Sequence, residues 1–208
     1  EEFNSPQKTL SFTKGIKHIF EDNARVHLNS IAILNFEYPI TFGELNRKAN
    51  QFAHYLIEKH EVKKGDSIAI ITKNTTYRII ALLGIIKSGG VYVPLDEDFP
   101  EERKNYILKD TGAKLLIEDN FLESSRKMAT AETVAVINIE NLINELEDYA
   151  IENPKIDVGL HDIFAILYTS GSTGYPKGVL VKNIGIINRL QWFWNHYKFT
   201  PQDVIYQK

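Results

Sequence analysis

The chain has 208 residues, which allows one large domain or two small ones, and its 43% hydrophobic content is enough to build a folded core. The formal net charge of −3 provides no basic surface for nucleic acid or anionic lipid. Cysteine is absent, which excludes disulfides, thiolate-bound zinc and cysteine nucleophiles. Residues 1–13 contain no apolar stretch of signal-peptide length, and the most apolar run, 79–86, is far shorter than a membrane span. We therefore expect a soluble, cytoplasmic protein that contacts neither membrane nor nucleic acid.

Hydrophobic periodicity predicts helices that alternate with strands along most of the chain. Apolar residues recur every three or four positions in the predicted helices, and they form short continuous runs in the predicted strands. The predicted helices lie at 15–25, from Thr41 to just before Gly65, and at 75–87, 100–110, 121–128 and 141–149. The predicted strands lie at 31–36, 67–72, 91–95, 114–118, 133–139 and 164–168.

Several helix ends carry specific signals. Thr41 and Glu44 have the spacing of a capping box, in which each side chain satisfies a free amide at the helix start. Asn74 or Thr75 can cap the next helix. The triplet Asp110-Thr111-Gly112 is predicted to end a later helix, because glycine readily adopts the left-handed conformation that closes helices. The same triplet occurs in aspartic proteases, but their chemistry needs a second copy and the chain has none.

The alternation of helices and strands predicts the fold class. Several strands are apolar on both faces, which is typical of a parallel sheet that is covered by helices on each side. We therefore expect an α/β fold with a largely parallel sheet flanked by helices. Within residues 1–208, the pattern separates a first α/β portion at about 1–150, a polar linker at 151–162, and a final strand, loop and helix at 163–208.

The segment after the predicted strand at 164–168 has the composition of a phosphate-binding loop. It reads Thr-Ser-Gly-Ser-Thr-Gly-Tyr-Pro-Lys-Gly from Thr169 to Gly178. Glycines allow successive backbone amides to converge on an anion, hydroxyl groups add donors, and the lysine adds positive charge. Each charge-assisted hydrogen bond contributes roughly 1.5–3 kcal/mol, so a few suffice to hold a polyphosphate. The candidate phosphate-binding residues are Thr169, Ser170, Gly171, Ser172, Thr173, Gly174 and Lys177.

Two other interpretations of this loop fit the residues less well. A flexible Ser/Gly-rich surface loop would not need the buried-type strand before it or the Pro-Lys-Gly after it. A Walker A loop requires lysine directly after the second glycine, whereas Lys177 lies three residues beyond Gly174 and no Gly-Lys pair occurs in the chain. The loop is therefore predicted to belong to another class of nucleotide-binding protein.

The stretch from Tyr168 to Gly178 resembles the signature of the adenylate-forming superfamily. This superfamily includes acyl-CoA synthetases, luciferases and the adenylation domains of nonribosomal peptide synthetases. Two earlier stretches, 40–50 and 86–96, are similar to the first two core motifs of the peptide-synthetase branch. Residues 188–192 and 203–208 also resemble that branch, so the resemblance covers almost the whole chain.

The resemblance implies that residues 1–208 are the N-terminal portion of an AMP-binding adenylation domain and contain most of its first α/β subdomain. The implied activity is ATP-dependent conversion of a carboxylic acid, with an amino acid favoured, into its acyl-adenylate with release of pyrophosphate. Transfer of the acyl group to the phosphopantetheine thiol of a carrier-protein domain would follow. By the same resemblance, Thr169 to Gly174 would hold the β- and γ-phosphates, and Lys177, the catalytic candidate, would offset their charge. The Mg²⁺ ligand is expected outside residues 1–208, and we expect these residues to be inactive alone.

Two alternatives stay open at this point. A stand-alone acyl-CoA ligase or D-alanyl-carrier protein ligase would share the chemistry and differ in the acyl acceptor. A non-catalytic module would bind nucleotide through the same loop without turning it over. The core motifs favour the peptide-synthetase branch over the stand-alone ligases.

Three further features are relevant to the site. Asn183-Ile184 stands where many superfamily members carry histidine and a basic residue, and Asn183 is predicted to cap a helix. Trp192 and Trp194 are two positions apart and are predicted to pack in the core or against another subdomain rather than against a ligand. The six histidines have no paired metal-ligand spacing, which predicts no histidine-bound metal.

Overall fold

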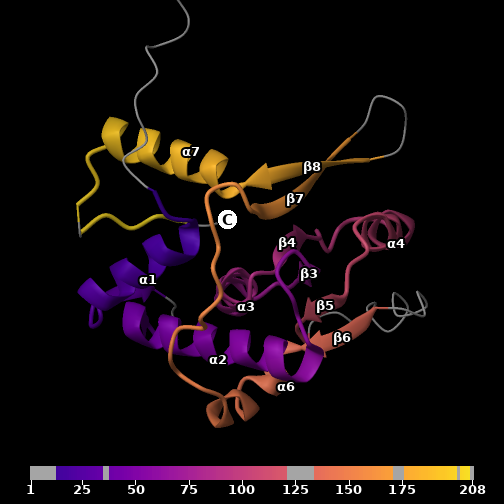
Figure 1. The fold of residues 1–208 in the computed structure, drawn as a ribbon, viewed down its shortest axis with the longest axis horizontal. Helices are drawn as coiled ribbons and strands as arrows, with labels where there is room; N and C mark the ends of the chain where they lie inside the picture. The colour runs from indigo at the N-terminus through magenta and orange to yellow at the C-terminus, as the bar shows by residue number, and fades with distance from the viewer. Residues whose placement is uncertain (1–12, 35–37, 121–133, 171–175, 201, 207–208) are drawn as a thin grey trace, which may run out of the picture.

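Figure 1 shows the computed structural model of the chain, which describes residues 13–34, 38–120, 134–170, 176–200 and 202–206. A six-stranded sheet forms its centre, with the strand order β6-β5-β3-β4-β7-β8. The first five strands in this order run parallel, whereas β8 pairs with β7 antiparallel. The strands are β3 (Ser67–Ile71), β4 (Val91–Pro94), β5 (Leu115–Glu118), β6 (Ala135–Asn138), β7 (Ile163–Thr169) and β8 (Lys177–Lys182).

Helices surround this sheet, and a short antiparallel strand pair lies outside it (Figure 1). The strand pair consists of β1 (Ile31–Ile33) and β2 (Ile40–Thr41). The helices are α1 (Ile16–Val26), α2 (Phe42–His60), α3 (Thr75–Lys87), α4 (Glu101–Asp110), α6 (Ile139–Leu142) and α7 (Asn183–His196), with a short 3₁₀ helix η1 (Glu145–Asp148). In the part of the chain that the structure describes, no helix is long and apolar enough to cross a membrane.

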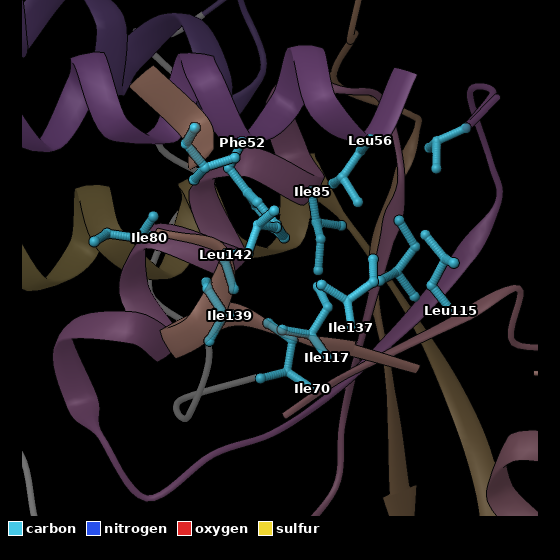
Figure 2. Close-up of a cluster of buried hydrophobic side chains, with 14 of the residues drawn as sticks. Phe52, Leu56, Ile70, Ile80, Ile85, Leu115, Ile117, Ile137, Ile139 and Leu142 are labelled. Atoms are coloured by element: carbon cyan, nitrogen blue, oxygen red, sulfur yellow. The ribbon is translucent and has the colours of Figure 1, made fainter. Parts of the chain in front are cut away.

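The larger part of the core fills the space between the sheet and helices α2 and α3 (Figure 2). Phe52 of α2 and Ile85 of α3 are fully buried there, and they face Ile68 and Ile70 of β3. Side chains alternate between the two faces of a strand, so the neighbours of these isoleucines point the other way.

The opposite face of the sheet is covered by α4. Ala69 and Ile71 of β3 pack there against Ile107 and Leu108 of α4. All five residues of β3 are therefore buried, which explains why the strand is apolar without interruption after Ser67. The predicted α/β fold with a largely parallel sheet flanked by helices is confirmed.

Three predicted helix ends agree with the structure, but α2 ends at His60 rather than just before Gly65. The Thr41 hydroxyl accepts a hydrogen bond from the Glu44 amide, and the Asn74 side chain accepts from the amides of Thr76 and Tyr77. Helix α4 ends at Asp110, and Gly112 follows with φ +57°, in the left-handed region that glycine adopts without strain. The triplet at 110–112 therefore closes a helix, as predicted.

The region before β7 differs from the prediction. A single helix was expected at 141–149, but α6 begins at Ile139 and ends at Leu142, and η1 follows separately. The Asn138 side chain accepts a hydrogen bond from the Asn141 amide and so starts the helix two residues earlier. The interruption lets apolar side chains of both short helices reach the same core. The helix predicted at 121–128 lies outside the described residues.

Asn183 does not cap helix α7, and this prediction is wrong. The N-cap position is Lys182, and Asn183 is the first helical residue. Its side chain is buried and bonds to other segments: Oδ1 accepts from the Ile16 amide at 3.1 Å, and Nδ2 donates to the Asp162 carbonyl at 3.1 Å. Asn183 satisfies these distant backbone groups because they, rather than its own helix end, lie within its reach.

Candidate phosphate-binding site

The predicted phosphate-binding residues include the last residue of β7, the first residue of β8 and residues that lie between these strands in the sequence. Gly171, Ser172, Thr173 and Gly174 fall outside the described residues. Thr169, Ser170 and Lys177 are described, and Thr169 pairs with Lys177 across the antiparallel ladder. The structure therefore places the first hydroxyl and the lysine of the predicted site opposite each other at the base of the hairpin.

The hairpin base presents its two faces to different surroundings. Paired residues of neighbouring strands share a face, so Thr169 and Lys177 lie on one face and Tyr168 and Gly178 on the other. Thr169, Ser170 and Lys177 are exposed, whereas Tyr168 packs against the core between β3 and α4. The exposed face is free to offer hydroxyl and ammonium donors to an anion.

The position of this base suits a ligand site. Strand β7 is parallel to β4, and the segment that joins β7 to β8 follows the carboxyl end of β7. In open α/β sheets, ligands bind outside the carboxyl ends of the strands. The sheet therefore places Thr169, the first residue of the candidate phosphate loop, at the edge where such folds hold their ligands.

Tyr168 connects the hairpin to helix α4. Its hydroxyl donates to Asp110 Oδ2 at 2.5 Å, and its ring meets the ring of Tyr106 edge-on, with centroids 6.5 Å apart. Burial raises the pKa of Tyr168, and the hydrogen bond and negative charge of Asp110 raise it further. The phenol therefore stays protonated and remains a donor to Asp110.

The described residues contain no group of three or more histidine, aspartate or glutamate side chains that could hold a metal ion. The Mg²⁺ ligand is expected outside residues 1–208, and this stays a prediction.

The two tryptophans of α7 do not pack in the core. Trp192 is 56% exposed and Trp194 is 44% exposed, so the prediction of core packing is wrong for both, whereas packing against another subdomain stays a prediction. Trp192 stacks on His196, with ring centroids 5.0 Å apart. A surface pocket of about 460 Å³ adjoins this helix, and the described candidates Thr169, Ser170 and Lys177 are not among its lining residues. Its lining residues are Arg189, Leu190, Phe193, Trp194, Phe199, Thr200, Asp203 and Ile205.

Sequence reasoning missed the contact between Tyr168 and Asp110. Asp110 belongs to the triplet at 110–112 and Tyr168 to the signature at 168–178, but the two residues are 58 positions apart. No local spacing rule pairs residues at that separation, and only the packing of α4 beside β7 brings them together.

The family model for AMP-binding enzymes matches residues 20–208. The chain belongs to this family of AMP-binding enzymes. It is 39% identical over 203 residues to a component of the plipastatin synthase of Bacillus subtilis (strain 168), and 35% identical over 208 residues to a component of the mycosubtilin synthase of Bacillus subtilis. These matches cover 97% and 100% of the chain but only 8% of each relative. The chain thus spans less than a tenth of these curated AMP-binding relatives.

Solved structures of AMP-binding enzymes share the fold. The nonribosomal peptide synthetase FmoA3, in its AMPPNP-bound form, superposes with a TM-score of 0.83 at 24% identity, over 97% of this chain and 21% of that one. The N-terminal domain of FACL13 from Mycobacterium tuberculosis has a TM-score of 0.75 at 26% identity, over 82% of this chain and 44% of that one. The resemblance to the adenylate-forming superfamily and its peptide-synthetase branch is confirmed.

Proposed function

We propose that the protein uses ATP to activate a carboxylic acid, with an amino acid as the favoured class. A carboxylate oxygen attacks the α-phosphorus of ATP, the bond between that phosphorus and the β-phosphate oxygen breaks, and pyrophosphate leaves. Acyl-adenylate is the product. The observation that carries the proposal is the pairing of Thr169 with Lys177 at the base of a hairpin that follows a parallel strand, in a member of the AMP-binding family.

The loop residues act on the leaving group in this proposal. Hydroxyls and amides from Thr169 to Gly174 hold the β- and γ-phosphates, and the Lys177 ammonium offsets their charge. Donors aligned with charge that develops in the transition state stabilise it without reorganising. The protein supplies no nucleophile, because the substrate carboxylate attacks directly. The AMPPNP-bound form of FmoA3 supports a nucleotide triphosphate as the ligand of this fold.

A carrier-protein phosphopantetheine thiol is the proposed acyl acceptor. Peptide synthases among the curated relatives support this acceptor. The alternative acceptor is coenzyme A. A fatty acyl CoA synthetase of Mycobacterium tuberculosis, which superposes with a TM-score of 0.74 at 25% identity, supports this alternative. Incubating the enzyme that holds acyl-adenylate with each acceptor distinguishes the two. Only the true acceptor should form a thioester, with release of AMP, at a catalytic rate.

The role of Lys177 is tested by replacing it with alanine in the full-length protein. One charge pair at about 4 Å and an effective dielectric near 20 contributes on the order of 4 kcal/mol before desolvation is subtracted. We therefore expect Lys177→Ala to slow amino-acid-dependent ATP–pyrophosphate exchange by about tenfold to a thousandfold, since each tenfold is about 1.4 kcal/mol. The melting temperature should change little, because Lys177 is exposed.

Lys182→Ala is the matched control, because Lys182 is an exposed lysine at the other end of the same strand. We expect it to retain wild-type exchange. Exchange would be measured with each of the proteinogenic amino acids in turn. An unchanged rate in Lys177→Ala, or an equal loss in both variants, contradicts the assignment of Lys177.

A further inference from the structure

The hairpin that carries the candidate site extends beyond the body of the sheet. Strand β7 pairs with β4 at a single position, Tyr92 with Ala165. Its pairing with β8 continues past that point to Thr169 and Lys177. In Figure 1 the end of the hairpin passes β4 on the side where α4 lies. In the described part of the chain, the end of β7 therefore has ladder hydrogen bonds to β8 alone.

Helix α4, rather than β4, contacts the end of β7. The Tyr168 hydroxyl donates to Asp110 at 2.5 Å, and Tyr106, one turn earlier on the same helix face, meets the Tyr168 ring edge-on at an interplanar angle of 88°. The helix itself is held firmly, because its Ile107 and Leu108 are buried against β3. Tyr168 thus connects the end of the hairpin to the exposed end of a helix that is packed on the core.

The carboxylate of Asp110 does not stabilise its own helix. It is the last residue of α4, where the helix macrodipole disfavours a negative charge. The acceptor that it offers to the Tyr168 hydroxyl explains its position better, because a hydrogen bond to a charged group is stronger than a neutral one.

Gly178 leaves room for the tyrosine ring. It stands directly opposite Tyr168 in the ladder, and a Cβ atom at this position would lie 3.1 Å from the Tyr168 Cζ atom and 3.2 Å from its hydroxyl oxygen. These distances are closer than ordinary contact, so the ring lies across the glycine. The face of the hairpin that points toward α4 is therefore filled by Tyr168, and Thr169 and Lys177 are turned to the opposite face.

We propose that Tyr168 and Asp110 are a positioning pair for the phosphate site, holding the base of the hairpin so that Thr169 and Lys177 face the β- and γ-phosphates of ATP. This inference rests on the proposed function. Without the pair, the hairpin end moves relative to the core, and binding phosphate must then order it. That ordering reduces the affinity for the polyphosphate part of the nucleotide alone. AMP lacks the β- and γ-phosphates and is not affected.

The test compares two nucleotides on the full-length protein by calorimetric titration. The probes are AMPPNP, which carries three phosphate groups, and AMP, which carries one. We expect Tyr168→Phe and Asp110→Ala each to weaken AMPPNP binding by about 3- to 10-fold, with the AMP affinity unchanged. The double variant should bind AMPPNP no more weakly than either single variant, since the two side chains act through one bond. Asp110→Asn, which keeps an acceptor oxygen, should recover most of the affinity.

Tyr38→Phe is the control, because this tyrosine is 79% exposed and far from α4 in the sequence. It should bind both nucleotides as the wild type does. A wild-type protein that binds neither nucleotide contradicts the proposed function itself. A wild type that binds AMPPNP while Tyr168→Phe binds it equally well overturns the positioning role. A parallel loss of AMPPNP and AMP binding with a lower melting temperature also overturns it, because that result indicates a general contribution to stability.

Discussion

A buried lysine shows how much a single side chain depends on distant partners. Lys87, at the end of α3, is 1% exposed, and its Nζ atom lies 2.7 Å from Glu21 Oε1 and 3.0 Å from Asn153 Oδ1. Burial lowers the pKa of Lys87 to about 8, although the hydrogen bond and charge of Glu21 oppose the shift. The lysine joins α1, α3 and the segment before β7, and it does so at the cost of keeping a charge out of water.

The lowered pKa of Lys87 predicts that the free energy of unfolding rises at alkaline pH. The pKa falls from an ordinary value of 10.5 to about 8 on folding, so between these values the unfolded chain binds more protons than the folded one. The cost of burying the charge is fully present below about pH 8 and is removed as the pH rises toward 10.5. Relative to Lys87→Met, the wild type should therefore gain up to about 3 kcal/mol over this interval. Urea unfolding at several pH values measures the gain.

The exposed Lys59 of α2 supplies the control for this experiment. Lys59→Met removes a lysine without removing a buried charge, so its stability relative to the wild type should not change over the same pH interval. A stability difference between the wild type and Lys87→Met that is constant with pH would show that Lys87 does not titrate as described.

At the scale of elements, the close approach of α2 and α3 depends on Gly84. A Cβ atom at this position in α3 would lie 2.6 Å from Phe52 Cδ1, the edge of a ring with no exposed surface. A contact this short requires one helix or the ring to move. Protein cores are packed too densely to absorb such a movement freely. The glycine is thus needed at the helix contact, although glycine is a poor helix former.

Gly84→Ala should therefore destabilise the protein. Alanine improves helix propensity by about 1 kcal/mol, but overpacking a core costs typically about 1–3 kcal/mol. We expect a net loss of roughly 1–2 kcal/mol, measured by urea unfolding. Adding Phe52→Leu to this variant should recover part of the loss, because it removes the ring that the new methyl group meets.

Gly185 of α7 provides a matched comparison, since it is also helical but a Cβ atom added there would have nothing within 4 Å. Gly185→Ala should be neutral or stabilising by up to about 1 kcal/mol, from helix propensity alone. If both glycine variants are stabilised, the contact between Gly84 and Phe52 does not limit the packing of the helices.

At the scale of the whole molecule, apolar side chains remain exposed near the last elements. Val179 and Leu180 of β8 are 48% and 59% exposed, and Trp192 and Trp194 lie open on α7. Exposed apolar surface of this kind promotes association with other protein surfaces.

We expect the 208 residues by themselves to bind ATP weakly and to show no amino-acid-dependent pyrophosphate exchange. The predicted site contacts only the phosphates, and nucleotide affinity is normally the sum of contacts to phosphates, sugar and base, reduced by the ordering of mobile groups. Calorimetric titration of the 208-residue polypeptide with Mg-ATP measures the affinity. Micromolar binding or measurable turnover would show that these residues form a complete site.

Local signals in the sequence determined much of the architecture. The caps at Thr41 and Asn74 and the helix end at 110–112 agree with prediction, because each depends on groups within a few residues. The parallel sheet follows from strands that are apolar on both faces. The signature at 168–178 indicates the family from the sequence alone, because its residues are contiguous in the chain.

Only the tertiary structure decided how distant residues meet. Three hydrogen bonds join segments that are 58 to 167 residues apart in the sequence. They link Tyr168 to Asp110, Lys87 to Glu21, and the Ile16 backbone amide to the side-chain oxygen of Asn183. Local propensity depends on neighbouring residues in the sequence, so it cannot predict such pairs. The strand order and the packing of helices on the sheet bring them together. Burial makes a polar partner necessary for Lys87 and Asn183, because an unpaired polar group in the core is costly.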